Sequence, residues 1–205
     1  MKIVTISREF GSGGRELGKR LADELDFAYY DREIISSIAH RCQLDESYVA
    51  GVAEKGLGGY PLTFRRTLSY GGMVQHNSMK VLVEQQSVIK ELAAQGRDCV
   101  IVGRGADVLL REYRPVNLFV YADLDSKLRR CRERASAEEQ LTDRELERKI
   151  KQVDAGRAKH RQLLTNSLWG RKENYHLCLN TTGHSIKELT PWVAGYINYW
   201  FGRTL

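Results

Sequence analysis

The sequence predicts an α/β fold in which five parallel strands form one sheet flanked by helices. Two observations support this prediction. Five short apolar runs alternate with helix-like stretches along the 205 residues, which is the order of a parallel sheet with crossover helices. A glycine cluster, Gly11–Gly14, also separates the first apolar run from the first helical pattern. We expect a single domain over residues 1–205, because this length provides ample core for one domain.

The first apolar run and the helix after it enclose a candidate phosphate-binding loop. Residues 3–6 predict a strand, and leucines spaced four apart from Leu17 to Leu25 predict a helix with one apolar face. Glycines let the backbone curl so that successive N–H groups point at one anion, and the helix N-terminus adds partial positive charge. This layout predicts a sheet of the P-loop NTPase type. The alternative is a plain strand-to-helix turn whose glycines allow close packing.

Three residues at this loop depart from the usual G-x-x-x-x-G-K-[ST] fingerprint. Aligned on Gly14, the chain has Glu9 in place of the first glycine, Arg15 in place of the lysine and Glu16 in place of the serine or threonine. An arginine can bridge two phosphate oxygens, and a carboxylate at Glu16 could bind Mg²⁺ itself. The residues expected to bind the phosphates of ATP are Gly11, Ser12, Gly13, Gly14, Arg15 and Glu16.

A second strand at residues 27–30 ends at Asp31, and residues 32–95 predict a helical acceptor-binding insertion. The glycine-rich stretch 56–61 and the pair Gly71–Gly72 predict mobile joints within this insertion. Asp31 could orient a magnesium-bound water or a substrate hydroxyl. It could equally cap the helix that follows.

Three further strands are predicted at residues 99–102, 117–121 and 176–180, and a C-terminal helix follows the last of them. Ligands on parallel sheets bind at the carboxyl ends of the strands, so residues that directly follow strands are candidates for a site. Arg104 follows the third strand, where it could clamp a substrate phosphate through two hydrogen bonds. It could also lie in a tight surface turn or pair with a structural carboxylate.

Residues 125–161 predict a charged, lid-like helical segment. Arg130 and Arg134 lie one helical turn apart, as do Arg157 and Arg161. Phosphoryl transfer spreads negative charge over the moving group, so guanidinium groups that close over it lower the barrier. The alternative is a solvated pair of helices laced by ion pairs between acidic and basic side chains.

Composition limits the partners and the compartment. The formal charge of +6 suits an anionic partner such as nucleotide phosphates, nucleic acid or a membrane surface. Nucleic acid is disfavoured because the basic residues are interleaved with acidic ones and no aromatic stacking platform lies among them. We expect no membrane partner, since neither a secretory signal nor a long apolar span is visible. The scattered cysteines form no C-x-x-C pair, which favours the cytoplasm.

The order of these features resembles the cytidylate kinase-like family of the nucleoside monophosphate kinase group. The resemblance covers nearly the whole chain, through ISREFGSGGRELGKRLA, FAYYDREII, DCVIVGRGADVLL, NLFVYADLDSKLRRCRERA, VDAGRAKHR and YHLCLNTTGHSIKEL. It implies that Gly11–Glu16 hold ATP phosphates and that Arg130 and Arg134 act as lid arginines. The residues that it assigns to the acceptor are Arg104, Asp154 and Arg157.

These features together predict a cytoplasmic, Mg²⁺-dependent kinase that moves a phosphoryl group from ATP to a nucleoside monophosphate or a related small acceptor. The expected catalytic residues are Arg15, Arg130 and Arg134. The expected acceptor contacts are Asp31, Arg104, Asp154, Arg157 and Arg161. Gly105 stands where true cytidylate kinases carry the aspartate that reads the base, so the identity of the acceptor stays open. A regulatory protein that binds nucleotide with little turnover is the alternative, and a homodimer is compatible with the long insertion.

Overall fold

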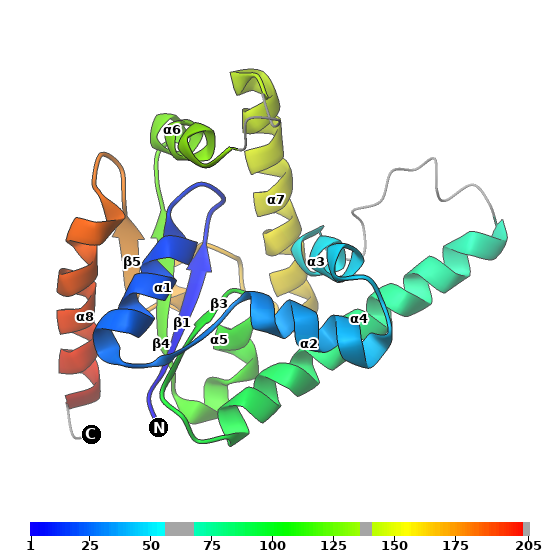
Figure 1. Ribbon diagram of the computed structural model, residues 1–205, viewed down its shortest axis with the longest axis horizontal. Helices are drawn as coiled ribbons and strands as arrows, with labels where there is room; N and C mark the ends of the chain where they lie inside the picture. The colour runs from blue at the N-terminus through cyan, green and yellow to red at the C-terminus, as the bar shows by residue number, and fades with distance from the viewer. Residues whose placement is uncertain (56–67, 136–140, 203–205) are drawn as a thin grey trace.

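Parallel strands form the centre of the molecule (Figure 1). The computed structural model describes residues 1–55, 68–135 and 141–202. One five-stranded sheet has the order β2-β3-β1-β4-β5, and every neighbouring pair is parallel. The strands are β1 (Ile3–Arg8), β2 (Ala28–Tyr30), β3 (Cys99–Val102), β4 (Val116–Tyr121) and β5 (Leu177–Asn180). The predicted α/β fold is therefore confirmed.

Apolar side chains cover both faces of this sheet. On one face, α1 (Gly14–Leu25) and α8 (Ile186–Gly202) pack on each other and on buried residues of β1, β3 and β4. On the other face, α2 (Arg32–Cys42), α4 (Leu68–Ala94) and the short α5 (Ala106–Leu109) form a second cluster with β1 and β3. Because the central strands are buried on both sides, their sequences read as nearly continuous apolar runs.

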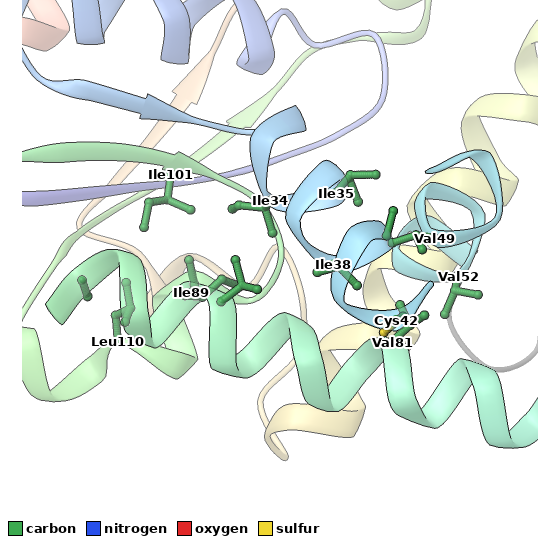
Figure 2. Packing of buried hydrophobic residues seen from close by; sticks show 14 of the residues in the cluster. Ile34, Ile35, Ile38, Cys42, Val49, Val52, Val81, Ile89, Ile101 and Leu110 are labelled. Carbon is green, nitrogen blue, oxygen red and sulfur yellow. The ribbon is translucent and has the colours of Figure 1, made fainter. Parts of the chain in front are cut away.

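The described part of the insertion between β2 and β3 consists largely of helices. Helix α3 (Glu46–Lys55) lies between α2 and α4 along the chain. Buried side chains of these three helices form one cluster with Ile101 of β3 and with Leu110 (Figure 2). The predicted joint at 56–61 lies outside the described residues. The joint predicted at Gly71–Gly72 is wrong, because both glycines lie inside α4; an interior glycine weakens a helix without necessarily ending it.

Two helices lie at the carboxyl ends of the strands (Figure 1). Helix α6 (Leu124–Arg134) begins at Asp123, whose carboxylate accepts a hydrogen bond from the backbone of Ser126. Helix α7 (Asp143–Leu164) begins with a capping box formed by Thr142 and Glu145. Helix α7 also buries an apolar face and packs against α3. The predicted charged segment is therefore two helices, of which α7 is part of the core rather than a fully solvated helix.

Helix α4 is long, at 27 residues, and could be mistaken for a span on length alone. None of the helices in the described part of the chain is both long and apolar enough to cross a membrane. The N-terminus and the end of α8 lie on the side of the sheet away from α6 (Figure 1). The carboxyl ends of the strands are therefore left to the loop between β1 and α1 and to the two charged helices.

Candidate active site

The predicted phosphate loop connects β1 to α1 at the centre of the sheet (Figure 1). It turns at Gly11 and Gly13, whose φ angles of 77° and 84° lie in the left-handed region that other residues rarely adopt. A Cβ on Gly13 would lie 2.5 Å from Cδ1 of Ile186, so close packing also requires a glycine there. The loop thus has the curled backbone that phosphate binding needs. It also has the close packing that a plain strand-to-helix turn would explain.

Helix α7 holds the start of this loop through Asp154 and Arg157. Asp154 Oδ1 accepts a hydrogen bond from the N–H of Phe10 at 2.8 Å, and Arg157 Nη1 donates to the carbonyl oxygen of Arg8 at 3.0 Å. Burial raises the pKa of Asp154 to about 6, and the Phe10 N–H and the Arg157 charge oppose this rise. The structure therefore places these two predicted acceptor contacts against the phosphate loop itself.

Arg130 ties α6 to the segment that follows β5. Its Nη1 donates to Thr181 Oγ1 at 3.1 Å, and its Nη2 donates to the carbonyl oxygens of Thr181 and His184 at 2.6 and 3.0 Å. Thr181 Oγ1 in turn donates to the carbonyl oxygen of Ser12 at 2.8 Å. Burial lowers the pKa of the Arg130 guanidinium. Arg130 thus fixes α6 beside the loop.

Arg15 and Glu16 lie in the first turn of α1, and both side chains form ion pairs. Arg15 Nε lies 2.6 Å from Asp31 Oδ2, and the Arg15 side chain is 49% exposed. Glu16 pairs with Arg20 at 2.8 Å and also with Arg134 of α6. Arg15 therefore extends away from the loop toward β2, whereas Arg134 reaches from α6 to the start of α1.

Asp31 lies between two arginines at the end of β2. It occupies the N-cap position of α2, but its side chain makes no capping hydrogen bond, so the capping interpretation is wrong. Besides the contact with Arg15, its Oδ1 lies 3.9 Å from Arg104 Nη2, and the Asp31 side chain is 3% exposed. Burial, with a smaller contribution from the Asp31 charge, raises the pKa of Tyr29 to about 12. Asp31 is therefore a buried carboxylate at the strand ends.

Arg104 occupies the turn after β3 in a left-handed conformation, with φ of 60°. Its carbonyl oxygen accepts a hydrogen bond from Gln85 Nε2 at 3.2 Å, and the same amide nitrogen lies 3.0 Å from His160 Nε2. Burial and the nearby Arg104 charge lower the pKa of His160 to about 4, so this ring is neutral at pH 7. The turn is thus anchored from α4 and α7, and the Arg104 side chain meets a carboxylate, Asp31.

Arg161 lies in a buried ion pair with Asp107 of α5. The side chains of Arg161 and Asp107 are 7% and 4% exposed. Arg161 Nε also donates to Ser167 Oγ at 3.0 Å, and the guanidinium carbon lies 5.4 Å from the ring centroid of Tyr175. These contacts join α7 to α5 and to the segment before β5.

A cavity of about 250 Å³, which we call the loop cavity, lies between the glycine loop and helices α6 and α7. Among the described residues that line it, Glu9 is acidic and six others are cationic. The cationic residues are Arg8, Arg15, Arg130, Arg134, Lys149 and Arg157. Charges of one sign gathered in a cleft raise the local concentration of an oppositely charged ligand. The charge of the loop cavity therefore favours an anion over a cation.

A smaller cavity of about 40 Å³, which we call the strand-end cavity, adjoins the turn after β3. Its lining includes the turn Gly103–Gly105, Asp107 and His160. Arg8 and Arg157 line both this cavity and the loop cavity. The two cavities therefore meet at these arginines.

Sequence reasoning missed Arg8, Lys127 and His160. Arg8 ends β1, so the rule that identified Asp31 and Arg104 at strand ends would also have found it. Lys127 Nζ pairs with Glu9 at 2.5 Å, and His160 contacts Gln85. Neither partner lies near its residue in the sequence, so no local pattern marks these two side chains.

Carboxylates near the loop bear on the predicted Mg²⁺ site. No group of three or more His, Cys, Asp or Glu residues that could hold a metal occurs in the described part of the chain. Mg²⁺ that binds with a nucleotide needs only one or two carboxylates, because phosphates and water supply its other ligands. Glu16 fits this requirement by its place at the start of α1. Its present partners, Arg20 and Arg134, would have to make room.

Comparisons with known proteins agree with this architecture. The model of the cytidylate kinase-like family matches residues 3–183, whereas no match was found among curated proteins. An uncharacterized protein from Eubacterium ventriosum is 22% identical with a TM-score of 0.69, over 97% of this chain and 99% of that chain. The shikimate kinase from Acinetobacter baumannii, solved with shikimate, is 14% identical with a TM-score of 0.56, over 99% of this chain and 96% of that chain. The shikimate kinase from Bacteroides thetaiotaomicron is 16% identical with a TM-score of 0.56, over 98% of this chain and 99% of that chain. The predicted P-loop fold is thus shared with solved kinases.

Proposed function

Because this chain belongs to the cytidylate kinase-like family, we propose that it transfers a phosphoryl group from ATP to a nucleoside monophosphate or a related small acceptor in the cytoplasm. The observation that carries the proposal is the loop cavity, where a curled glycine loop faces six cationic side chains. Loop N–H groups, the N-terminus of α1 and these cations all favour the negative charge of a polyphosphate.

On the donor side, the N–H groups of Gly11–Glu16 hold the phosphates of ATP. Arg134, now paired with Glu16, turns from this carboxylate to the phosphates when the nucleotide enters. Arg130 keeps α6 in place through its contacts with the segment after β5. Positioning and neutralisation of charge supply most of the rate in phosphoryl transfer, so the site needs no strong general base.

On the acceptor side, Asp31 lies at the end of β2 between Arg15 and Arg104. Asp31 Oδ1 is buried and accepts no hydrogen bond from the described residues, so an acceptor hydroxyl group that reaches this atom would supply the hydrogen bond that it lacks. Arg104 and Arg157 provide positive charge for an acceptor phosphate. Arg161 acts from a distance by holding Asp107 against the turn that carries Arg104.

Mg²⁺ bound with ATP neutralises part of the phosphate charge and helps to orient the transferring group. Among the residues at the loop, Glu16 is the one that we propose as its protein ligand. Asp154 and Arg157 support the same geometry by fastening the first residues of the loop.

A second candidate function is a regulatory protein that binds nucleotide with little turnover. Two ion pairs favour the regulatory protein, namely Arg15 with Asp31 and Glu16 with Arg134. Arg15 stands at the lysine position of the fingerprint and Glu16 at the serine or threonine position, and both side chains are already engaged. An enzyme must break at least one of these pairs in each cycle, whereas a sensor can keep both.

The experiment that tests the proposal is ADP release from ATP and Mg²⁺, measured with CMP, dCMP, UMP, AMP, GMP and no acceptor. Release that depends on one of these acceptors would support the kinase and identify its acceptor class. ATP binding by calorimetry without release for any acceptor would favour the regulatory protein. Absence of both binding and release would contradict both functions.

A further inference from the structure

Arg8 is the last residue of β1, the central strand of the sheet. The fingerprint places no functional group at this position, which immediately precedes the loop. Arg8 is 8% exposed, and it lines both the loop cavity and the strand-end cavity. An arginine at this place therefore lies between the proposed donor and acceptor sites.

Two glycines leave the space that the Arg8 side chain fills. A Cβ on Gly14 would lie 2.5 Å from Arg8 Cβ, and a Cβ on Gly103 would lie 1.8 Å from Arg8 Nη1. The first glycine begins α1 and the second follows β3, so they border opposite ends of the same side chain. Gly103 also has a φ of 76°. The backbone around the site is thus shaped to seat a guanidinium against the turn after β3.

Arg15 does not occupy a comparable place, although the fingerprint aligns it with the usual lysine. Its guanidinium is held by Asp31 at 2.6 Å, and about half of its side chain is exposed. A cation in contact with water and paired with a carboxylate exerts a weaker pull on a phosphate than one in a buried cleft. The position of the missing lysine is therefore filled by a residue that turns toward β2.

We propose that Arg8 supplies the cation that the phosphate loop lacks, by contacting the terminal phosphate of ATP where the two cavities meet. This inference rests on the proposed function and assigns a residue to the transferring group. A guanidinium suits the task because it stays charged when buried and offers two parallel N–H donors to phosphate oxygens. Arg157, which also lines both cavities, holds the carbonyl oxygen of Arg8 and so fixes the strand end.

The test compares the dissociation constants of ADP and of a non-hydrolysable ATP analogue, both with Mg²⁺, by calorimetry. The variants are Arg8→Met, which keeps the length of the side chain, Arg8→Lys, which keeps its charge, and Arg15→Met. Arg132→Met is the matched control, because Arg132 lies on α6, pairs with Asp143 and lines neither cavity. Thermal melting of each variant verifies that the fold is retained.

We expect Arg8→Met to weaken binding of the analogue about tenfold to a hundredfold more than binding of ADP, the size of one lost charge-assisted hydrogen bond. Arg8→Lys should recover part of this loss. Arg15→Met should change the ratio of the two constants by less than about threefold, as for other half-exposed ion pairs. The control should match the wild type.

Two results would overturn the inference while leaving the proposed function in place. One is an unchanged ratio of the two constants in a folded Arg8→Met protein. The other is a selective loss of analogue binding in Arg15→Met instead. Failure of the wild-type protein to bind either nucleotide would overturn the proposed function and this inference together.

Discussion

Replacing Arg161 with methionine should destabilise the protein because it leaves a buried carboxylate without its partner. The Asp107 side chain is 4% exposed and pairs with Arg161, so water cannot replace the lost guanidinium. The change also removes a hydrogen bond to Ser167 at 3.0 Å and the contact with the Tyr175 ring. Methionine fills much of the remaining volume, so loss of charge rather than loss of packing dominates.

Breaking a buried ion pair on one side costs about 3–5 kcal/mol. For a domain of this length each kcal/mol lowers the melting temperature by about 2–4 °C, so Arg161→Met should melt about 6–20 °C below the wild type. Removal of both charges in the double variant Asp107→Leu with Arg161→Met should restore most of the stability, because an apolar pair often replaces a buried ion pair at little cost.

Urea unfolding of the wild type, both single variants and the double variant gives the four corners of a mutant cycle. We expect the double variant to be more stable than Arg161→Met alone. A loss below about 1 kcal/mol in Arg161→Met, the range of exposed pairs, would refute the structural role of Arg161. A selective rise in the KM for the acceptor, with stability unchanged, would instead place Arg161 on the acceptor.

Three further predictions follow from the site. Glu16→Gln should raise the Mg²⁺ concentration needed for half-maximal ADP release several-fold if Glu16 holds the metal, and an unchanged Mg²⁺ dependence would remove it from that role. Gly103→Ala should lower the melting temperature, because its Cβ would meet the Arg8 guanidinium at 1.8 Å; the melting temperature should partly recover when Arg8→Ala is added, and a Gly103→Ala protein as stable as wild type would contradict this packing. Burial raises the pKa of Asp154 to about 6, so the Asp154 carboxyl lowers the stability of the folded state as pH rises from about 4 to 6. Burial lowers the pKa of His160 to about 4, so the His160 ring raises the stability of the folded state as pH rises from about 4 to 6.5. In urea titrations at several pH values over this window, the free energy of unfolding should rise more steeply with pH in Asp154→Asn than in wild type. It should rise less steeply in His160→Gln. A pH dependence equal to that of wild type in both variants would contradict both pKa shifts.

The sheet could be predicted from the sequence because strands buried on both faces appear as continuous runs of apolar residues. The run Cys99–Val102 is apolar at every position and forms a strand with the predicted bounds. The same reasoning located Asp31 and Arg104 at strand ends, since chain order alone brings these ends to one edge. It failed at Gly71–Gly72, because glycine weakens a helix without necessarily ending it, and both glycines lie inside α4.

The contacts of the arginines could not be predicted, because their partners are far away in the sequence and come close only in the folded chain. Arg15 lines the loop cavity but pairs with Asp31, and Arg130 binds carbonyl oxygens after β5. The contact between Phe10 and Asp154 spans 144 positions of sequence. Helical spacing correctly grouped Arg157 with Arg161 on α7. It could not show that Arg157 binds the carbonyl oxygen of Arg8, whereas Arg161 pairs with the buried carboxylate of Asp107.

Phosphoryl transfer is tested best by following the terminal phosphoryl group of ATP itself. The protein is incubated with Mg²⁺ and ATP labelled in its terminal phosphate, together with a mixture of nucleoside monophosphates and other small hydroxyl compounds, and the products are separated by mass. We expect label in a new phosphorylated small molecule, formed only when active protein is present. Label that stays in ATP, or that leaves only as free phosphate, while ATP binding is measurable would contradict phosphoryl transfer and favour the regulatory protein.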